Sequence, residues 1–174
     1  MNNYLISDMH LGHYNIIKLG ERPFNFLDEM HTVLIDNWNN TVNRDDTIFC
    51  LGDSFWSPMA VEYLLPRLKG RIVFLRGNHD ANKTWKTMKE ICPEHIYIDS
   101  PYFETYLHNY HITFCHYPMY SWNGSGHKDS WHFHGHIHQK VLDTQHPQRI
   151  NVSVEAINYT PVNIKEYLFR ATNE

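Results

Sequence analysis

Five short motifs place carboxylates, imidazoles and one amide at the ends of apolar runs. In chain order they are Asp8-Met9-His10, Gly52-Asp53, Gly77-Asn78-His79-Asp80, His116, and Gly135-His136-Ile137-His138. Residues two apart on an extended chain lie on the same side, so the two ends of the D-x-H and H-x-H motifs can face one ligand together. Oxygen and imidazole donors suit divalent transition-metal ions. The pattern therefore predicts a metal site assembled from several segments.

Strands and helices alternate in the first half of the chain. The β-type runs Tyr4 to Ser7, Thr47 to Leu51 and Arg71 to Leu75 each stop at one of these polar clusters. Segments 27–42 and 58–68 have helical character, and Pro66 is expected to end or kink the second early. This alternation predicts a parallel sheet, in which ligands collect at the carboxyl ends of the strands.

The second half has a different pattern, dominated by strands. YFETYL and HITFCHY flank HNYH as a hairpin, and WHFHGHIH, RINVSVE and a terminal helix near NIKEYLFRA follow. We expect a second, mainly antiparallel sheet packed on the first. No repeat or Gly/Ser linker divides the sequence, so residues 1–174 are expected to form a single domain.

The stretch WHFHGHIH carries four histidines at alternate positions. His132 and His134 precede Gly135 and are expected to be strand-face or supporting groups. His136 and His138 follow the glycine and are the candidate ligands. The row is therefore predicted to divide into two supporting residues and two ligands.

Charge and cysteine content narrow the function classes. A net charge of -4 and a pI near 6.4 give no general basic field, so stable binding to duplex nucleic acid is not expected. Cys50, Cys92 and Cys115 are too widely spaced for a disulfide framework or a C-x-x-C zinc site, and we read Cys50 and Cys115 as buried fillers. With no signal peptide and no membrane-length apolar run, a cytoplasmic protein without a membrane partner is expected.

Taken together in this order, DMH, GD, GNHD, CHYP and GHIH resemble the pattern of the calcineurin-like metallophosphoesterase superfamily, here of the small bacterial or phage type. The resemblance spans residues 8 to 138. It implies an α/β (mixed α+β) fold, a four-layer αββα sandwich of two β-sheets flanked by helices.

The resemblance also implies a role for each motif residue. Asp8, His10 and His138 would hold one divalent ion, Asn78, His116 and His136 a second, and Asp53 would bridge the two. His79 would be the general acid that protonates the leaving group, while a metal-bridging hydroxide attacks phosphorus. Manganese is the favoured metal, with Fe, Zn, Ni or Co as alternatives.

The expected activity is hydrolysis of a phosphodiester, of nucleotide type or another small diester that includes short oligonucleotides. No arginine cluster lies near the motifs to bind the second charge of a monoester. A phosphomonoesterase is the alternative, and a non-catalytic metal-binding scaffold is a more distant one. Asp and Asn in the ligand set disfavour a structural zinc protein.

In GDSFW, Trp56 stands where the phosphoprotein phosphatases of the superfamily carry an aspartate that supports the catalytic histidine. The group that orients His79 is therefore undetermined from the sequence.

Five further residues near the motifs have open roles. His13 would either touch a substrate phosphate or contact only solvent, and Arg76 would either bind a phosphate or form a salt bridge. Asp80 is expected to orient a loop or His79. Trp122 and Trp131 would be either substrate-stacking platforms or core residues.

Overall fold

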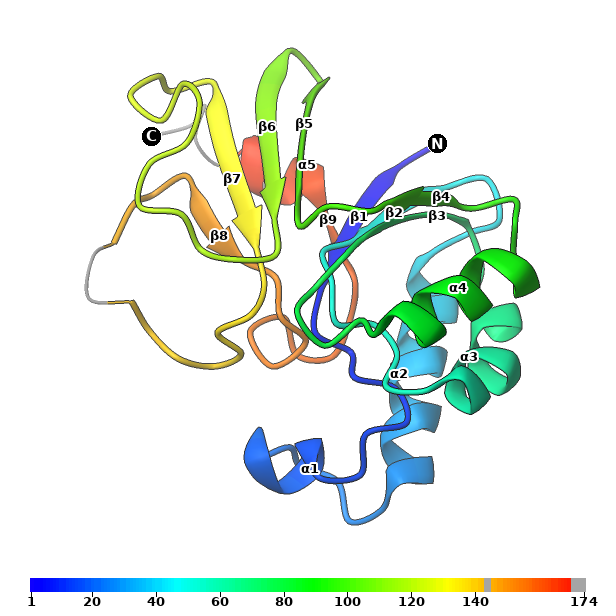
Figure 1. Cartoon of the computed structure of the whole chain (residues 1–174). Coiled ribbons are helices and arrows are strands. Elements are labelled where there is room, and N and C mark those ends of the chain that lie inside the picture. Colours follow the sequence, from blue (N-terminus) through cyan, green and yellow to red (C-terminus); the bar gives the residue numbers. More distant parts are fainter. Residues whose placement is uncertain (143–144, 170–174) are drawn as a thin grey trace.

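A computed structural model describes residues 1–142 and 145–169 of the chain and contains two β-sheets (Figure 1). The first sheet has the strand order β4-β3-β2-β1-β9. Its strands are β1 (Asn3–Ile6), β2 (Thr47–Cys50), β3 (Arg71–Leu75), β4 (Ile96–Ile98) and β9 (Val162–Asn163). β1 to β4 pair in parallel, as the alternation of strands and helices predicts, and β9 adds an antiparallel edge to β1.

Helices cover the face of this sheet that points away from the second sheet (Figure 1). They are α2 (Leu27–Thr41), α3 (Pro58–Leu64) and α4 (Asn82–Ile91), while α1 (Ile16–Leu19) is a single turn in the loop after β1. α2 buries Met30, Leu34, Ile35 and Trp38, which recur at helical spacing. α3 gives way to a 3₁₀ turn at Leu65–Arg67, which confirms the effect expected of Pro66.

The second sheet has the order β5-β6-β7-β8. Its strands are β5 (Tyr102–Leu107), β6 (Tyr110–Cys115), β7 (Ser130–His134) and β8 (Arg149–Asn151). The predicted hairpin joins β5 to β6 through His108 and Asn109, whose φ angles of 54° and 69° fit a two-residue type I′ turn. β6 pairs with β7 and β7 with β8 in parallel, so the expectation of a mainly antiparallel sheet is wrong. The long connections after β6 and β7 return the chain to the end of the sheet where the preceding strand begins, as parallel pairing requires.

The α/β architecture with two β-sheets is confirmed, and most of its helices lie against the first sheet (Figure 1). α5 (Ile164–Leu168) follows β9, contacts both β9 and β1, and reaches Phe133 of the second sheet through the ring of Tyr167. Residues 170–171, the end of the expected terminal helix, lie outside the described residues.

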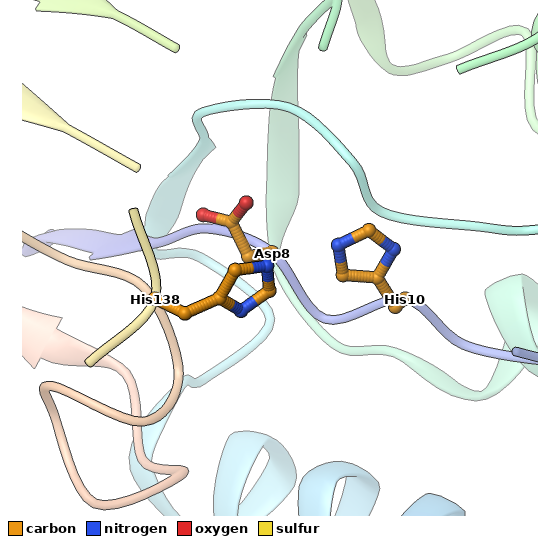
Figure 2. Close-up of side chains that lie close together, drawn as sticks. All are labelled: Asp8, His10 and His138. Carbon is orange, nitrogen blue, oxygen red and sulfur yellow. The ribbon is translucent and has the colours of Figure 1, made fainter. Parts of the chain in front are cut away.

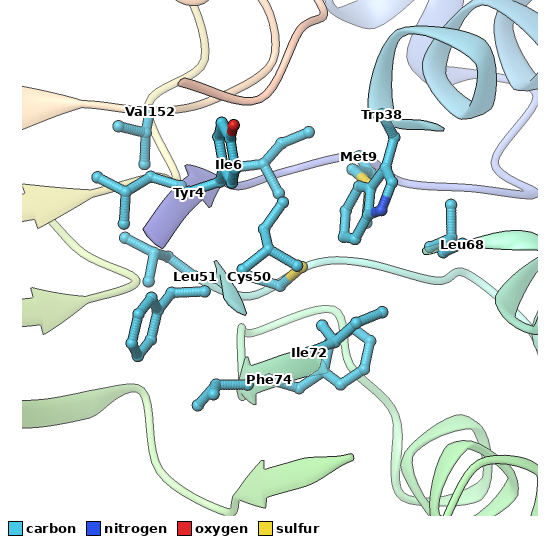
Figure 3. Packing of buried hydrophobic residues seen from close by; sticks show 14 of the residues in the cluster. Tyr4, Ile6, Met9, Trp38, Cys50, Leu51, Leu68, Ile72, Phe74 and Val152 are labelled. Atoms are coloured by element: carbon cyan, nitrogen blue, oxygen red, sulfur yellow. The ribbon is translucent and has the colours of Figure 1, made fainter. Parts of the chain in front are cut away.

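One hydrophobic cluster joins the two sheets. Phe49 of β2 stacks on Phe114 of β6 with ring centroids 4.6 Å apart. Around β1, β2 and β3 the core contains Ile6, Cys50, Ile72 and Phe74, with Trp38 packed over them from α2 (Figure 3). These buried strands hold the loops at their carboxyl ends in fixed positions. In the part of the chain that is described, no helix is both long and apolar enough to cross a membrane.

Candidate metal centre

Loops that leave the carboxyl ends of β1 and β2 run side by side and bond to each other through the backbone. The N–H of Asp8 donates to the carbonyl of Gly52 over 3.1 Å, and the N–H of His10 donates to the carbonyl of Asp53 over 2.9 Å. The D-x-H and G-D motifs therefore extend the pairing of their strands for several residues. This places the carboxyl groups of both motifs at one end of the first sheet.

Most of the predicted ligands have a left-handed backbone, which is rare for residues other than glycine. Positive φ angles between 50° and 71° occur at Asp8, His10, Asp53, His136 and His138. Such conformations cost free energy and persist where the surrounding structure imposes them, commonly at functional sites. The strain thus coincides with the residues that the motifs single out.

Asp8, His10 and His138 form a first group of donors. One ligand atom from each lies within 4.8 Å of the other two (Figure 2). Oδ1 of Asp8 and Nε2 of His10 are buried and have no hydrogen-bond partner among the described residues. A buried polar atom without a partner is costly, and a bound cation would satisfy both atoms.

A second group adjoins the first through Asp53. Its Oδ2 lies 3.7 Å from Nε2 of His10 and 3.4 Å from Nε2 of His116. Oδ1 of Asn78 lies 2.9 Å from the same nitrogen of His116 and 3.0 Å from Nδ1 of His136. All seven predicted ligands therefore lie in one place, with Asp53 between the two groups.

Two of the histidines use one ring nitrogen on an outer partner. Nδ1 of His138 lies 2.9 Å from Oε1 of Glu155, and Nδ1 of His116 lies 2.8 Å from the carbonyl oxygen of Leu51. Each acceptor requires a proton on Nδ1, so in the neutral ring Nε2 carries no proton and has a lone pair to offer. Histidine ligands of metals show this arrangement regularly, because the outer acceptor sets the tautomer and the ring orientation.

Behind these ligands lies a buried ion pair that the sequence reading missed. Arg22 donates from Nε to Glu155 over 2.8 Å, and its two terminal nitrogens donate to the carbonyls of Met9 and Asp8. Ser153 donates to Oδ2 of Asp8. A carboxylate directly after the RINVSV run is a signal for Glu155, whereas nothing in the sequence around Arg22 distinguishes it from a surface arginine.

Burial and hydrogen bonding shift the pKa values of this site in opposite directions. Burial raises the pKa of Asp8 and lowers that of His10 to about 2, because each charged form is poorly solvated. Burial also raises the pKa of Glu155, but the hydrogen bond from His138 and the charge of Arg22 outweigh it and hold the pKa below its usual value. His10 is thus a neutral donor at physiological pH.

Two glycines approach the ligands so closely that a side chain would displace them. A Cβ at Gly135 would overlap Oγ of Ser7 and Oδ2 of Asp8, and a Cβ at Gly77 would overlap Oδ1 of Asp53. The absence of a side chain at these positions lets the GHIH and GNHD loops pack onto the carboxylates.

His79 is exposed at the edge of the site. Its backbone N–H donates to Oδ1 of Asp53 over 2.8 Å, so its loop is tied to the ligand cluster. Trp56 lies beside it, and His13 is half-buried and stacks on Trp56 rather than contacting only solvent.

Arg76 and Asp80 are both engaged in contacts within the chain. Arg76 forms a salt bridge to Asp99 over 2.7 Å, and Asp80 accepts hydrogen bonds from the backbone of Asp53, Ser54 and Gly77, so it orients loops. Trp122 and Trp131 are buried and belong to the interior. His132 and His134 are buried in β7, and the three cysteines are buried and free.

A third group of donors lies at the other end of the first sheet. Cys92, Glu94 and His95 follow α4 and border a cavity of about 670 Å³. Four basic residues, Arg44, Arg67, Lys69 and Arg71, line the same cavity. Nδ1 of His95 faces the N–H of Ile72. Neither strained backbone nor an unpartnered buried donor marks this group among the described residues.

Sequence comparison finds a relative in an archaeon. The chain is 40% identical over 170 residues to the uncharacterized protein MJ1445 of Methanocaldococcus jannaschii, and the match covers 92% of this chain and 86% of that protein. The chain belongs to the family of this archaeal protein. No family model matches it.

Comparison of structures supports the fold. The crystal structure of a protein of unknown function, AQ665 from Aquifex aeolicus, matches with a TM-score of 0.71 and 24% identity, and covers 95% of this chain and 96% of that one. A structure described as a novel archaeal phosphodiesterase has a TM-score of 0.48 and 17% identity, over 88% of this chain and 82% of that one. The first similarity shows a common fold, and the second carries no weight for fold or activity.

Proposed function

We propose that this chain is a metal-dependent phosphodiesterase of the calcineurin-like metallophosphoesterase type that acts on a nucleotide-type or other small diester. The carrying observation is the arrangement of His116 and His138, each of which gives Nδ1 to an outer acceptor, beside the unpartnered Oδ1 of Asp8 and Nε2 of His10. Nε2 of His116 lies beside Asn78 and Asp53, two other members of the candidate donor set. This is the arrangement expected of a prepared metal site.

In the proposal the donors divide into two ligand groups. Asp8, His10 and His138 would hold one divalent ion, and Asn78, His116 and His136 a second, with Asp53 between them. Two such ions about 3.5 to 4 Å apart would bind a phosphoryl group and lower the pKa of a water molecule. Mn²⁺ is the ion we propose, because the donors are oxygen and imidazole nitrogen without thiolate.

His79 would act as the general acid in this reaction. Its imidazole is exposed, lies on the loop of Asn78, and is tied to Asp53 through the backbone. A proton given to the leaving oxygen avoids the release of an unstabilised alkoxide, an effect on the order of a hundred- to ten-thousandfold.

The arginines near the site favour a diester over a monoester. Arg22 is buried and its guanidinium is committed to Glu155 and to two backbone carbonyls, and Arg76 is paired with Asp99. A monoester dianion carries a second negative charge that would need such a group. A monoanionic diester needs fewer cationic contacts.

Hydrolysis of bis-p-nitrophenyl phosphate after removal of metal with a chelator and restoration with Mn²⁺ tests the proposal, with p-nitrophenyl phosphate measured in parallel. We expect activity that returns with the metal, favours the diester, and survives in His127→Ala, which changes an exposed histidine outside the site. Preference for the monoester would indicate a phosphomonoesterase. No turnover with Mn, Fe, Zn, Ni or Co, despite bound metal, would indicate a non-catalytic scaffold.

A further inference from the structure

The imidazole of His79 lies against two other rings. Its centroid is 5.5 Å from that of His10, in an edge-on arrangement of 61°, and 5.6 Å from that of Trp56, tilted by 39°. In the part of the chain that the structure describes, no side chain or carbonyl forms a hydrogen bond with either ring nitrogen of His79. Ring contacts therefore determine the direction of this side chain.

Trp56 is held at a fixed point of the fold. Its N–H donates to the carbonyl of Leu11 over 2.9 Å, directly after Phe55, which pairs with Leu11 in a parallel bridge. The next residue, Ser57, caps α3 by accepting the N–H of Ala60 over 3.3 Å. The backbone of Trp56 is thus anchored both before and after the side chain.

His13 covers one face of the Trp56 indole. The two rings are parallel within 4°, with centroids 3.6 Å apart. The N–H of His13 donates to the carbonyl of His10 over 3.0 Å, so this stack is attached to the D-x-H loop. Trp56 remains 40% exposed despite its contacts with these histidine rings, which places it at the surface of the site.

We propose that Trp56, supported by His13, is a positioning residue that holds the imidazole of His79 in the direction required to protonate the leaving oxygen. This inference rests on the proposed function. A general acid must lie within hydrogen-bond reach of the atom that it protonates, and a misplacement of about 1 Å can cost on the order of a hundredfold in rate. An exposed histidine with no hydrogen bond to its ring needs another restraint, and the indole provides it.

Leaving groups of different basicity separate this role from others. The p-nitrophenyl and phenyl esters of methyl phosphate share the group that stays on phosphorus, but p-nitrophenolate departs without a proton whereas phenolate benefits from one. With Mn²⁺-loaded protein we expect Trp56→Ala to lower kcat for the phenyl ester by about tenfold to a hundredfold and to change kcat for the p-nitrophenyl ester by less than about twofold. KM should change little for either ester.

Three further variants complete the test. Trp56→Phe keeps a ring beside His79 and should recover most of the phenyl ester rate. The retained p-nitrophenyl ester rate of Trp56→Ala shows that its loss is not caused by misfolding. Tyr63→Ala removes an exposed ring of α3 that lies outside the site and should leave both rates unchanged. The double variant Trp56→Ala/His79→Ala should be no slower than His79→Ala, because residues that act through one group are not additive.

Several results would overturn the inference. Equal losses for the two esters would indicate a structural role for Trp56, and a rise in KM alone would indicate a platform that stacks on substrate. Additive losses in the double variant would show that Trp56 acts independently of His79. Failure of the unaltered protein to hydrolyse either ester would refute the proposed function itself, and the inference with it.

Discussion

Two pairs of histidines from one alternating stretch have different surroundings in this molecule. His132 and His134 lie in β7, are buried, and have the extended backbone of a strand. His136 and His138 follow Gly135 and have left-handed φ angles of 71° and 52°. Residue type and spacing are the same on both sides of the glycine, so neither distinguishes a ligand from a supporting residue.

The ring nitrogens of His132 and His138 are used differently. Nε2 of His132 accepts the N–H of Met119 over 3.1 Å, and its Nδ1 donates to the carbonyl of Thr113 over 3.2 Å, so both nitrogens are engaged. Among the described residues, His138 has a hydrogen-bond partner for Nδ1 only, in Glu155. His134 also engages Nδ1, with the carbonyl of Gly135 over 3.0 Å, so burial inside β7 is what sets it apart from the half-buried His138.

Removal of a ring from the second pair should have the largest effect. His138→Ala deletes a member of the first donor group. Loss of a residue that only supports a ligand costs up to about a hundredfold, so loss of a ligand itself should lower Mn²⁺-dependent hydrolysis of bis-p-nitrophenyl phosphate by at least that factor. Thermal unfolding should change little, because His138 is only half-buried. Activity within a few fold of the unaltered protein would refute the ligand assignment of His138.

The boundary between the pairs should be nearly as sensitive. In Gly135→Ala the new Cβ would meet Ser7 and Oδ2 of Asp8, so the GHIH loop and the Asp8 carboxylate must separate. We expect about a tenfold to hundredfold loss of Mn²⁺ affinity, the range for disturbed outer contacts, measured by isothermal titration. Gly126→Ala is the matched control, because a Cβ there meets nothing within 4 Å. Equal affinities in both variants would contradict the close packing of this loop.

Loss of the outer carboxylate should weaken the metal site by a similar or smaller factor. Glu155→Gln keeps the size of the side chain but removes the charge that fixes the tautomer of His138, and about a tenfold loss of Mn²⁺ affinity is expected. Glu104→Gln provides the control, since Glu104 forms a comparable contact with His111 over 3.3 Å away from the donors. If the two variants bind Mn²⁺ alike, Glu155 has no role in preparing the site.

The first pair should affect stability rather than activity. Burial lowers the pKa of His132 to about 4 from a usual value of 6.5, so the folded state binds fewer protons than the unfolded chain between these values. The stabilisation is complete above pH 6.5 and is lost as the pH falls towards 4, by about 3 kcal/mol for this residue. Urea unfolding at pH 7, 6 and 5, with chelator present, measures it.

His132→Asn should show a flatter dependence of the unfolding free energy on pH than the unaltered protein. His127→Asn, which changes an exposed histidine, should keep the original slope. Identical slopes in the two variants would mean that His132 is not a neutral buried group.

The sequence predicts the first sheet more accurately than the second. Apolar runs at β1, β2 and β3 are separated by helical segments, and parallel pairing follows from that alternation. In the second sheet the described parts of the connections from β6 to β7 and from β7 to β8 contain no long helix, so nothing in the local pattern indicates parallel pairing. The two-residue strand β9 is too short to be recognised from its residues.

For the site, the motifs identify the residues that converge but not the contacts that orient them. Asp8 and His10 could be paired from their spacing alone, because both follow a strand end. The hydrogen bonds of Arg22 and the stacking of His13 on Trp56 form only when loops that are distant in the sequence lie next to the end of β1. Residue periodicity does not predict contacts of this kind. The convergence of candidate ligands can thus be predicted from a sequence when each follows a strand end, whereas the residues that contact them become visible only in the fold.

The most direct measurement is the anomalous difference map of crystals grown with Mn²⁺. We expect two peaks about 3.5 to 4 Å apart beside Asp53, within ligand distance of Asp8, His10 and His138 on one side and Asn78, His116 and His136 on the other. No peak should occur at His132, His134 or Cys92. A protein that binds Mn²⁺ only at the Cys92 group, or not at all, would contradict the two-metal site.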